Sequence, residues 1–438
     1  MKAVIVYERK IRELENAILL QMQLEKQGIQ TDIRQFYEIK NPFLILKKID
    51  YLFLPSLYET KAIPRAFTRY GKPRYLINLQ YEQVLNEKWE KLGHHNPKGQ
   101  AINAFHICWG EETKKRLIRA GVPKQNAIVT GAMQLDMLRN EFREEYLYDK
   151  EYLSKKYKLD SNKRWNLFIS SFTYADIEDE RLKMNENIAK TSLTDYKDLH
   201  TKSRIKILDW FELALKKDEQ SIFIYRPHPD ELALERVKIL QKKYDNFVII
   251  RSEGVKHWIN SSDLIYSWFS TSIVEAYFLN KPFILLRPYT IDNQTESMIM
   301  KNIDKITNDD DFLLNHISAS KKNTYLNSKI IDKYYDNSYK PAFERIINSV
   351  NTMEKNDVKQ CFNISKKMYL KAFITTCIVS VVYHISKISL IRINNDLKYR
   401  NKLLRWIKEL RNQIATDEEK RKIREILINT NLVKGDNK

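Results

Sequence analysis

The sequence predicts an α/β protein with two parallel-sheet domains and a helical C-terminal tail. Short apolar runs alternate with stretches of helical periodicity as far as about position 350, which is typical of a mainly parallel sheet. A length of 438 residues with 43% hydrophobic side chains suits two domains with sizeable cores. Because the composition changes after about Met353, we expect domains over residues 1–150 and 151–350 and a tail over 351–438.

Composition and charge narrow the class of protein. Cys108, Cys361 and Cys377 lie too far apart for a disulfide framework or a metal-binding spacing, so a reducing cytoplasm is expected. The chain enters its first strand without an apolar leader, which predicts no export. Its net charge of +19 predicts an anionic partner, although part of the charge is solvated surface. Motifs of nucleic-acid-binding proteins are absent, so we expect a nucleotide, a lipid diphosphate or a membrane surface.

The first domain is expected to hold six short strands. Helical spacing from Ile11 to Leu24 follows the first strand and ends near Gly28. No Gly-x-Gly-x-x-Gly follows that strand, so the usual dinucleotide fingerprint is absent. The expected strands are Ala3–Val6, Thr31–Ile33, Tyr51–Leu54, Tyr75–Leu79, Phe105–Trp109 and Ala127–Val129.

A charged segment, residues 139–164, reads as an interdomain helix and linker. Strand Asn166–Ile169 then opens the second sheet, and a hydroxyl-bearing loop follows it. Residues 176–206 are polar with little periodicity, which predicts an excursion from the sheet. Helical spacing returns at Arg204–Leu215.

The centre of the second domain is a pair of strand–loop–helix units between Ser221 and Pro288. Strand Ile222–Tyr225 must end at the following Arg-Pro-His-Pro, because proline cannot continue a ladder. His228 is therefore presented on a rigid loop.

The second unit joins strand Leu264–Tyr266 to helix Ile273–Leu279 and then to strand Phe283–Leu286. Between the first strand and the helix lie three residues of good N-cap type, Ser270, Thr271 and Ser272. A helix start with free N–H groups and hydroxyls can bind an anion.

These two loops are expected at one edge of the sheet, because ligands of open α/β sheets lie at the carboxyl ends of strands. The imidazole of His228 and the hydroxyl-rich helix start suit a phosphate or diphosphate, and Glu275 could accept hydrogen bonds from a ribose. Pro-His-Pro can equally be an ordinary turn, and Ser-Thr-Ser an ordinary cap. Their occurrence in order on adjacent units favours the functional interpretation.

The motifs RPHPDE and SxxSTSxxEAxxxNKPFIL resemble the donor half of bacterial GT-B glycosyltransferases that build surface polysaccharides, particularly those using CMP-activated nonulosonic acids or Kdo. They are also similar to the CDP-glycerol glycerophosphotransferases. The resemblance implies two Rossmann-like domains facing a cleft, with the His-Pro and Ser/Thr elements holding the donor phosphate and cytidine ribose. The implied nucleotide-binding residues are Arg226, His228, Pro229, Ser270, Thr271, Ser272 and Glu275. By its position, the loop with Ser170, Ser171 and Thr173 could touch the donor phosphates, and an ordinary turn is equally plausible.

Three further segments extend the resemblance to about residues 1–350. YERKIRELENAILLQMQLEKQG looks like the opening of bacterial surface-carbohydrate biosynthesis proteins, with Glu8, Arg12 and Glu13 as the matching residues. ICWGEETKKRLIRAGVPKQNAIVTGAMQLDML and YYDNSYKPAFERIINSV match later parts of that family. Glu8 and Arg12 are expected on the acceptor side.

Transfer to a hydroxyl acceptor needs a group that removes the acceptor's proton. The family often has paired acids and a glycine where this chain has Tyr-Glu-Gln-Val, and Glu82 is the predicted base with His228 as the other catalytic residue. The departure leaves a solvated glutamate at a helix start as the alternative, and Glu8 as the reserve base.

No cofactor or metal ion is expected. Helix dipoles and side chains can stabilise the leaving phosphate in this fold, and the CMP-sugar is a substrate. The acidic runs at 178–180 and 309–311 are interpreted as exposed, and His94 and His95 as loop residues.

The tail contains an apolar stretch, Tyr369–Ile385, that is interrupted by Lys371 and His384 and flanked by lysines. It is shorter than the roughly 20 apolar residues of a spanning helix. An interfacial helix on anionic headgroups fits it, and a helix buried against the second domain is the alternative. Residues 398–428 predict a basic amphipathic region, a solvated hairpin or a docking surface, with Leu403, Leu404, Ile407, Leu410 and Ile414 at helical spacing.

Together these features predict a glycosyltransferase at the cytoplasmic face of the inner membrane. It would move a sugar from a CMP-linked donor to a polysaccharide or lipid-linked glycan, with an anionic membrane surface as a further partner and no nucleic acid. The alternatives are a CDP-polyol phosphotransferase, a UDP-sugar transferase, and a non-catalytic protein that binds polyanions or membranes.

Overall fold

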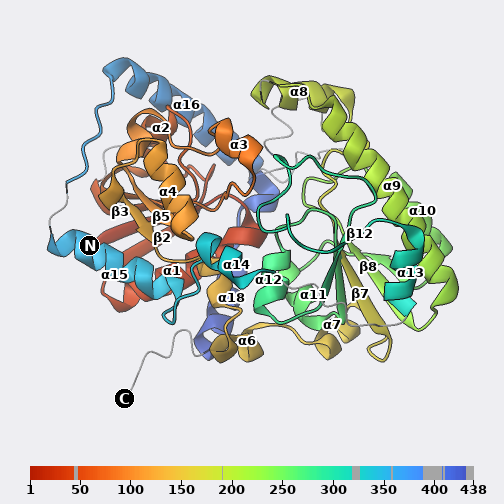
Figure 1. Ribbon diagram of the computed structural model, residues 1–438. Helices are drawn as coiled ribbons and strands as arrows, with labels where there is room; N and C mark the ends of the chain where they lie inside the picture. Colours follow the sequence, from red (N-terminus) through yellow and green to blue (C-terminus); the bar gives the residue numbers. More distant parts are fainter. Residues whose placement is uncertain are drawn as a thin grey trace. The chain divides into compact units, whose positions relative to one another are not determined.

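The structure, a computed structural model, describes residues 1–43, 48–189, 191–317, 326–356, 359–387, 407 and 410–430. The chain forms two compact units, Met1–Tyr146 with Ile331–Lys438 and Leu147–Ile330. Each unit contains a six-stranded sheet with helices packed against it (Figure 1).

The sheet of the first unit has the strand order β2-β1-β3-β4-β5-β6, and all neighbours are parallel. All six strands predicted for the first domain are confirmed. The order reverses between β1 and β3, and ligands of open parallel sheets bind at the carboxyl ends beside such a reversal. The strands are β1 (Lys2–Tyr7), β2 (Gln30–Gln35), β3 (Lys48–Leu54), β4 (Lys72–Asn78), β5 (Phe105–Cys108) and β6 (Ala127–Val129).

Helix α1 (Lys10–Lys26) confirms the helical spacing after the first strand. It ends before Gly28, whose φ of 75° is the left-handed conformation that glycine adopts freely. Its inner face buries two polar residues, Glu13 and Asn16, beside the aliphatic ones. The other elements up to residue 146 are α2 (Ala62–Tyr70), α3 (Glu87–Lys91), the 3₁₀ turns Gly99–Asn103 and Lys124–Asn126, α4 (Glu111–Arg119), α5 (Met133–Asp136) and α6 (Asn140–Tyr146).

The chain returns to the first unit after Ile330, whereas the sequence predicts a second domain that runs to 350. The first turn of helix α15 (Ala342–Lys355) is bound by the side chain of Asp136. The two carboxylate oxygens of Asp136 accept the backbone N–H groups of Ala342 at 2.8 Å and Phe343 at 2.9 Å. These contacts satisfy donors that every helix start leaves open. They attach α15 to the first unit, which is why the second unit ends earlier than expected.

The described part of the tail also belongs to the first unit. Helix α16 (Lys366–Ser386) packs on α2, with Thr376 Oγ1 and Thr68 Oγ1 2.8 Å apart. Helix α18 (Asp417–Asn429) packs on α1. The alternative of a tail helix packed on the second domain is therefore wrong, because α16 finds its polar and apolar partners in the first. Leu403 and Leu404, predicted at helical spacing, lie outside the described residues.

The sheet of the second unit has the order β12-β11-β10-β7-β8-β9, again with parallel neighbours. Its first strand lies in the middle, the next two on one side and the last three on the other, which is the order of dinucleotide-binding folds. Four strands were predicted; β9 and β12 are too short to show periodicity. The strands are β7 (Arg164–Ile169), β8 (Ser221–Arg226), β9 (Phe247–Ile249), β10 (Leu264–Ser267), β11 (Phe283–Leu286) and β12 (Lys305–Ile306).

The segment 176–206, expected as a polar excursion with little periodicity, is largely helical. It forms α8 (Asp179–Ala189) and most of α9 (Thr194–Lys217). The first half of α9 buries the polar side chains of His200, Ser203 and Arg204, so no apolar periodicity marks it. The remaining helices are α7 (Lys150–Tyr157), α10 (Glu235–Lys243), α11 (Val255–Ser261), α12 (Ile273–Phe278), α13 (Asp309–Ile317) and α14 (Ser328–Tyr334).

Replacing Asp136 tests the attachment of α15. Asp136→Ala leaves two buried N–H groups without an acceptor, so we expect the free energy of unfolding of the first unit to fall by about 2–4 kcal/mol. Asp136→Asn keeps one acceptor oxygen and should lose about half as much. Urea unfolding of the three proteins measures this, and an unchanged midpoint for Asp136→Ala would contradict the attachment.

Candidate functional site

Three loops meet at the carboxyl edge of the second unit's sheet. They follow β7 at residues 170–173, β8 at residues 227–231 and β10 at residues 268–272. Because β7 lies between β8 and β10, the three loops are neighbours, and the strand order reverses between β7 and β10. The structure thus brings the predicted donor-binding loops to the sheet edge where ligands of this topology bind.

His228, on the loop after β8, has a defined hydrogen-bonding direction. Its Nδ1 accepts the backbone N–H of Asp230 at 3.1 Å. A neutral imidazole whose Nδ1 accepts carries its proton on Nε2. The half-buried ring therefore has Nε2–H as its donor group.

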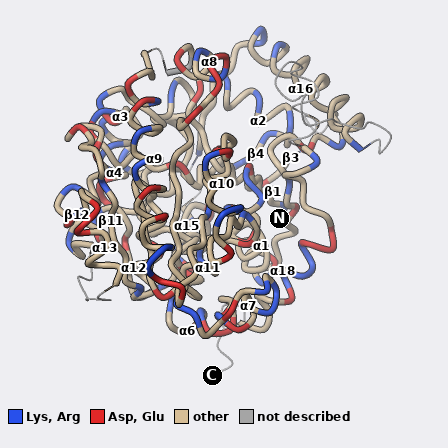
Figure 2. The backbone as a smooth tube through the Cα atoms, turned by 90° about the vertical axis from the view of Figure 1, so that its right-hand side faces the viewer, with Lys and Arg blue, Asp and Glu red and all other residues tan. Residues whose placement is uncertain are grey.

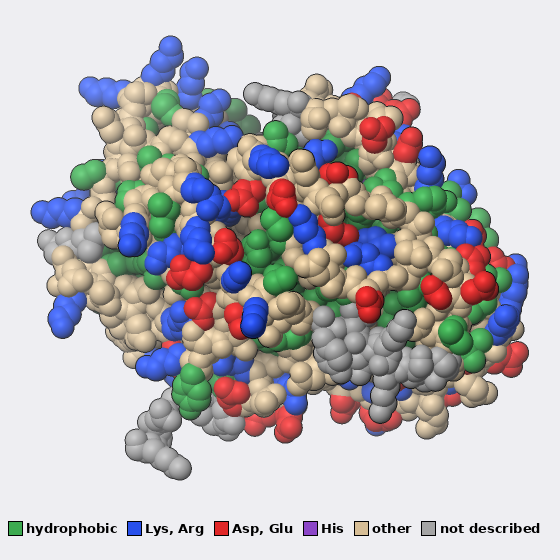
Figure 3. Space-filling view, in the orientation of Figure 1, with side chains coloured by type: hydrophobic (Ala, Val, Ile, Leu, Met, Phe, Trp, Pro, Cys, Tyr) green, Lys and Arg blue, Asp and Glu red, His purple; other side chains and the backbone are tan. Residues whose placement is uncertain are grey.

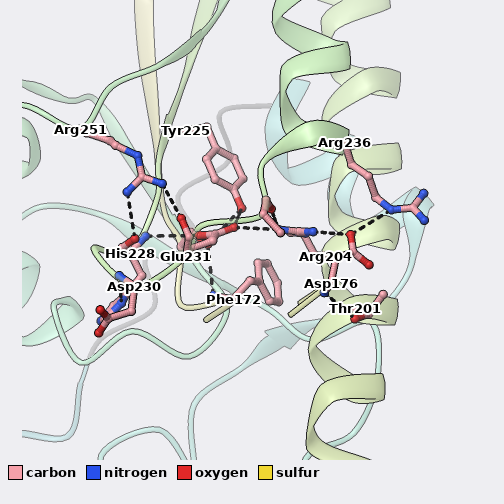
Figure 4. Close-up of polar contacts among 12 residues, drawn as sticks. Phe172, Asp176, Thr201, Arg204, Tyr225, His228, Asp230, Glu231, Arg236 and Arg251 are labelled. Carbon is pink, nitrogen blue, oxygen red and sulfur yellow. Dashed lines mark hydrogen bonds and ion pairs between the residues drawn. The ribbon is translucent and has the colours of Figure 1, made fainter. Parts of the chain in front are cut away.

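Glu231 is the buried centre of the polar network behind this loop (Figure 4). Its Oε2 accepts hydrogen bonds from Ser170 Oγ at 2.6 Å and from the backbone N–H of His228 at 3.3 Å. Its Oε1 accepts from Tyr225 Oη at 2.7 Å and Arg204 Nη1 at 3.2 Å. Only 1% of Glu231 is exposed. One carboxylate thus joins the β7 loop, β8, α9 and the His228 loop.

Burial dominates the electrostatics of this network. It raises the pKa of Glu231, although the hydrogen bonds from Ser170, Tyr225 and Arg204 act in the opposite direction. Arg204, itself 1% exposed, also donates to Asp176 Oδ2 at 2.6 Å. Removing either partner of this buried pair would leave an uncompensated charge.

Two arginines fix the backbone of the same edge. Arg251 donates to the carbonyl oxygens of His228, at 3.3 Å, and of Glu231. Arg226 donates to the carbonyl oxygens of Ser252, at 2.7 Å, and of Glu253, and burial lowers its pKa to about 10. The guanidinium of Arg226, predicted to bind nucleotide, therefore holds the loop after β9.

The serines after β7 have different environments. Ser170 Oγ lies between Glu231 and Tyr225, so it supports the network. Ser171 Oγ is enclosed and has no hydrogen-bond partner among the residues that the structure describes. The contact of Ser171 and of half-buried Thr173 with donor phosphates stays a prediction.

The loop after β10 is held by its own hydroxyl groups. Ser270 N–H donates to Ser267 Oγ at 3.1 Å, and Ser270 Oγ accepts the N–H of Ser272 at 3.3 Å. Ser272 is the N-cap residue of α12, but its side chain makes no capping hydrogen bond. Thr271 is exposed, as is Pro229 on the neighbouring loop.

Glu275, predicted to contact the ribose, lies one turn into α12 and is half-buried. Burial raises the pKa of its carboxyl group, while the positive charges of Lys256 and Arg226 act in the opposite direction.

The carboxyl edge of the first unit's sheet carries an arginine between two carboxylates. Buried Glu13 accepts the backbone N–H groups of Glu8 at 2.6 Å and Arg9 at 3.3 Å, which anchors the start of α1. Arg12 donates to Glu13 Oε1 from Nε at 3.0 Å and from Nη2 at 2.6 Å. The same Nη2 lies 2.7 Å from Glu82 Oε1. The structure therefore brings the predicted acceptor-side residue Arg12 and the predicted base Glu82 together.

Glu8 and His95 have perturbed acidities at this edge. Burial and then repulsion from Glu13 raise the pKa of Glu8. Burial lowers the pKa of His95 to about 4, so the ring is neutral at pH 7, and it packs 4.5 Å from the ring of Tyr58. The charge of Glu82 acts on both rings. His94 and His95 lie in the turn after α3, as predicted.

Three residues of the polar network at the carboxyl edge of the second unit's sheet are not predicted from the sequence: Arg204, Glu231 and Arg251. Only Glu231 has a visible signal, since it ends the motif RPHPDE. No group of three or more His, Cys, Asp or Glu side chains in the described ranges is arranged to hold a metal ion.

No protein-family model and no curated protein matches the chain. Solved structures do match. A crystal structure of a UDP-N-acetylglucosamine 2-epimerase is 13% identical, with a TM-score of 0.50 over 83% of this chain and 99% of that chain. The UDP-GlcNAc 2-epimerase of Methanocaldococcus jannaschii, in complex with UDP-GlcNAc and UDP, is 15% identical, with a TM-score of 0.49 over 80% of this chain and 100% of that chain.

The wall teichoic acid polymerase TagF is 11% identical, with a TM-score of 0.48 over 82% of this chain and 90% of that chain. At such identities, likeness concerns the fold alone. The chain has a GT-B-type fold. The two parallel sheets and the first of these matches carry that assignment and confirm the predicted fold class.

The Glu231 network predicts a large effect on stability. Glu231→Gln removes the charge opposite buried Arg204 and adds an amide donor among four donors, so the free energy of unfolding of the second unit should fall by about 3 kcal/mol. Exposed Glu235→Gln is the matched control and should change it by less than about 0.5 kcal/mol. Equal urea midpoints for the two variants would refute this account of the network.

Proposed function

We propose that the chain is a glycosyltransferase of bacterial surface-polysaccharide synthesis that takes its sugar from a CMP-activated donor. The observation that carries the proposal is the position of the His228 ring at the carboxyl edge of β8, where Nδ1 accepts the N–H of Asp230 and Glu231 and Arg251 hold the backbone; this contact assigns the ring proton to Nε2. A phosphate oxygen at that position would accept a charge-assisted hydrogen bond. The imidazole would stabilise the charge that develops on the phosphate as the sugar leaves.

The other donor contacts follow from the neighbouring loops. The β10 loop at Ser270 and Thr271 would meet the phosphate, and Glu275 would accept from the ribose hydroxyls. The choice of cytidine, and of a nonulosonic acid or Kdo as the sugar, is supported by the motifs RPHPDE and SxxSTSxxEAxxxNKPFIL. The donor is a substrate, and the proposed reaction needs no further cofactor.

The acceptor side would be the Glu8, Arg12 and Glu82 cluster of the first unit. A general base works best when its pKa lies near the working pH. Glu8 has a raised pKa, whereas Glu82 is paired with Arg12 at 2.7 Å. We therefore propose Glu8 as the base that removes the acceptor's proton, and Glu82 as the partner that orients Arg12.

A UDP-linked donor is the second candidate. The solved structure with a TM-score of 0.50 is of a UDP-N-acetylglucosamine 2-epimerase, although that likeness concerns the fold alone. A CDP-polyol donor would use the same cytidylyl contacts as CMP. A panel of nucleotides therefore identifies the nucleobase of the donor. Product analysis then distinguishes sugar transfer from phosphopolyol transfer.

Nucleotide binding tests the donor site. We expect CMP or CDP to stabilise the protein in a thermal-shift panel that also contains UMP, UDP, GDP and ADP. His228→Ala should weaken CMP binding about ten- to a hundredfold, because it removes a hydrogen bond to a charged group. Exposed His384→Ala, in the first unit, is the control and should bind as wild type.

A preferential response to UDP would move the donor to UDP-sugars. Failure of every nucleotide to stabilise folded wild-type protein, or equal binding by wild type and His228→Ala, would refute the donor site.

The pH dependence of enzyme activity tests which residue is the catalytic base. Glu8→Gln should lower kcat by on the order of a hundredfold or more, and Glu82→Gln much less. A base must be deprotonated, so wild-type kcat/KM should fall as pH drops through the pKa of Glu8, at a higher pH than for an ordinary glutamate. If Glu82→Gln loses more activity than Glu8→Gln, Glu82 is the base.

A further inference from the structure

Helix α16 carries a row of aliphatic side chains that nothing in the described structure covers. Leu370, Ile374, Ile378 and Val381 are 61%, 52%, 55% and 58% exposed. Their spacing of three or four residues places them on one face of the helix. Scattered exposed apolar residues are ordinary, but a continuous row of this kind marks an interaction surface.

The opposite face of α16 is held by the first unit. Thr376 Oγ1 meets Thr68 Oγ1 at 2.8 Å, and Ser380 Oγ donates to the carbonyl oxygen of Ile39 at 2.9 Å. Val379 belongs to the unit's apolar core. The helix is thus fixed with its aliphatic row outward.

The charges that α16 itself carries are positive. The 21 residues of α16 include no Asp or Glu, and Figure 2 shows no acidic position on it. Lys366, Lys367 and Lys371 are exposed at its start and Lys387 just after its end. In Figure 3, Lys and Arg side chains gather at the upper left, where Figure 1 places one end of α16.

By length and composition alone α16 could cross a membrane, and 33% of its most apolar window is buried. A crossing helix would have to leave α2 and expose the paired hydroxyls of Thr68 and Thr376. Burying polar groups in lipid without such partners is costly. The packing therefore favours a helix that lies along a surface.

We propose that this face of α16 docks the first unit onto an anionic lipid bilayer. The aliphatic row would enter the boundary between headgroups and acyl chains, and the lysines would contact anionic headgroups. This surface shares no residue with the donor site, so the inference stands or falls independently of the proposed function.

The surface has one consequence that rests on the proposed function. A cavity of about 200 Å³ lies behind α16, lined by Val379 and Val382 of the helix and by Glu8, Arg9, Gln35, Tyr37, Leu410 and Gln413. Docking would bring the bilayer to within about one helix diameter, roughly 10 Å, of the cavity that contains Glu8. The acceptor class this geometry favours is a lipid-linked glycan.

Vesicle flotation of the full chain tests the docking. Wild type should bind vesicles of phosphatidylglycerol and phosphatidylcholine, and bind pure phosphatidylcholine more weakly. Ile374→Ser with Ile378→Ser should weaken binding about tenfold or more. The matched control is Ile239→Ser with Leu314→Ser, two residues of the second unit that are 62% and 66% exposed, which should bind as wild type.

Charge reversal tests the choice of lipid. Lys367→Glu with Lys371→Glu should abolish the preference for phosphatidylglycerol, whereas Lys217→Glu with Lys242→Glu, exposed lysines of the second unit, should keep it. A CMP thermal shift in the α16 variants reports separately on the donor site.

Four results would overturn the proposal. The first two are absence of vesicle binding by wild type and equal loss of binding in the α16 variant and its control. The third is resistance of bound protein to alkaline carbonate extraction, which indicates a spanning helix. The fourth is a wild-type dimer that Ile374→Ser with Ile378→Ser dissociates without changing vesicle binding.

Discussion

The carboxyl edge of the second unit's sheet depends on one buried carboxylate. Glu231 accepts hydrogen bonds from a strand, a helix and two loops, and the donating residues range in sequence from Ser170 to His228. A carboxylate this deeply buried is stable only when its hydrogen bonds are satisfied. The position of any one of these elements therefore constrains the others. The backbone N–H of His228 donates to Glu231, which fixes the position of the His228 loop. The contact of His228 Nδ1 with the N–H of Asp230 then sets the direction of Nε2–H.

Much of the fold can be read from the sequence, because parallel strands buried on both faces are continuous apolar runs. Ala3–Val6 and Ile222–Tyr225 stand out in this way, whereas the edge strand β2, QTDIRQ, is mostly polar and only partly buried. The packing partner of a helix is harder to predict from the sequence than the helix itself. Nothing local indicates that α15 attaches to Asp136, about 200 residues earlier, or that α16 packs on α2. The early part of α9 is missed for a related reason, since its buried face is polar.

The site shows the same limit. A histidine after a strand that ends in proline can be recognised from sequence, because proline stops the ladder at a known edge. Arg226 in the same motif looks like a phosphate ligand, yet its guanidinium is taken by two carbonyl oxygens. Ser170 looks like a ligand-facing hydroxyl and instead supports Glu231. Which polar groups remain for a ligand is decided by long-range pairing, which spacing along the chain does not encode.

The most direct test of the central claim is nitrogen NMR on protein labelled at its histidine side chains, with His228 assigned from the spectrum of His228→Gln. The account predicts that, at neutral pH, His228 is protonated on Nε2 and unprotonated on Nδ1. It also predicts that CMP shifts the Nε2–H signal to that of a stronger hydrogen bond while Nδ1 stays unprotonated. A free protein with the proton on Nδ1, or a ring that responds to no nucleotide, would contradict it.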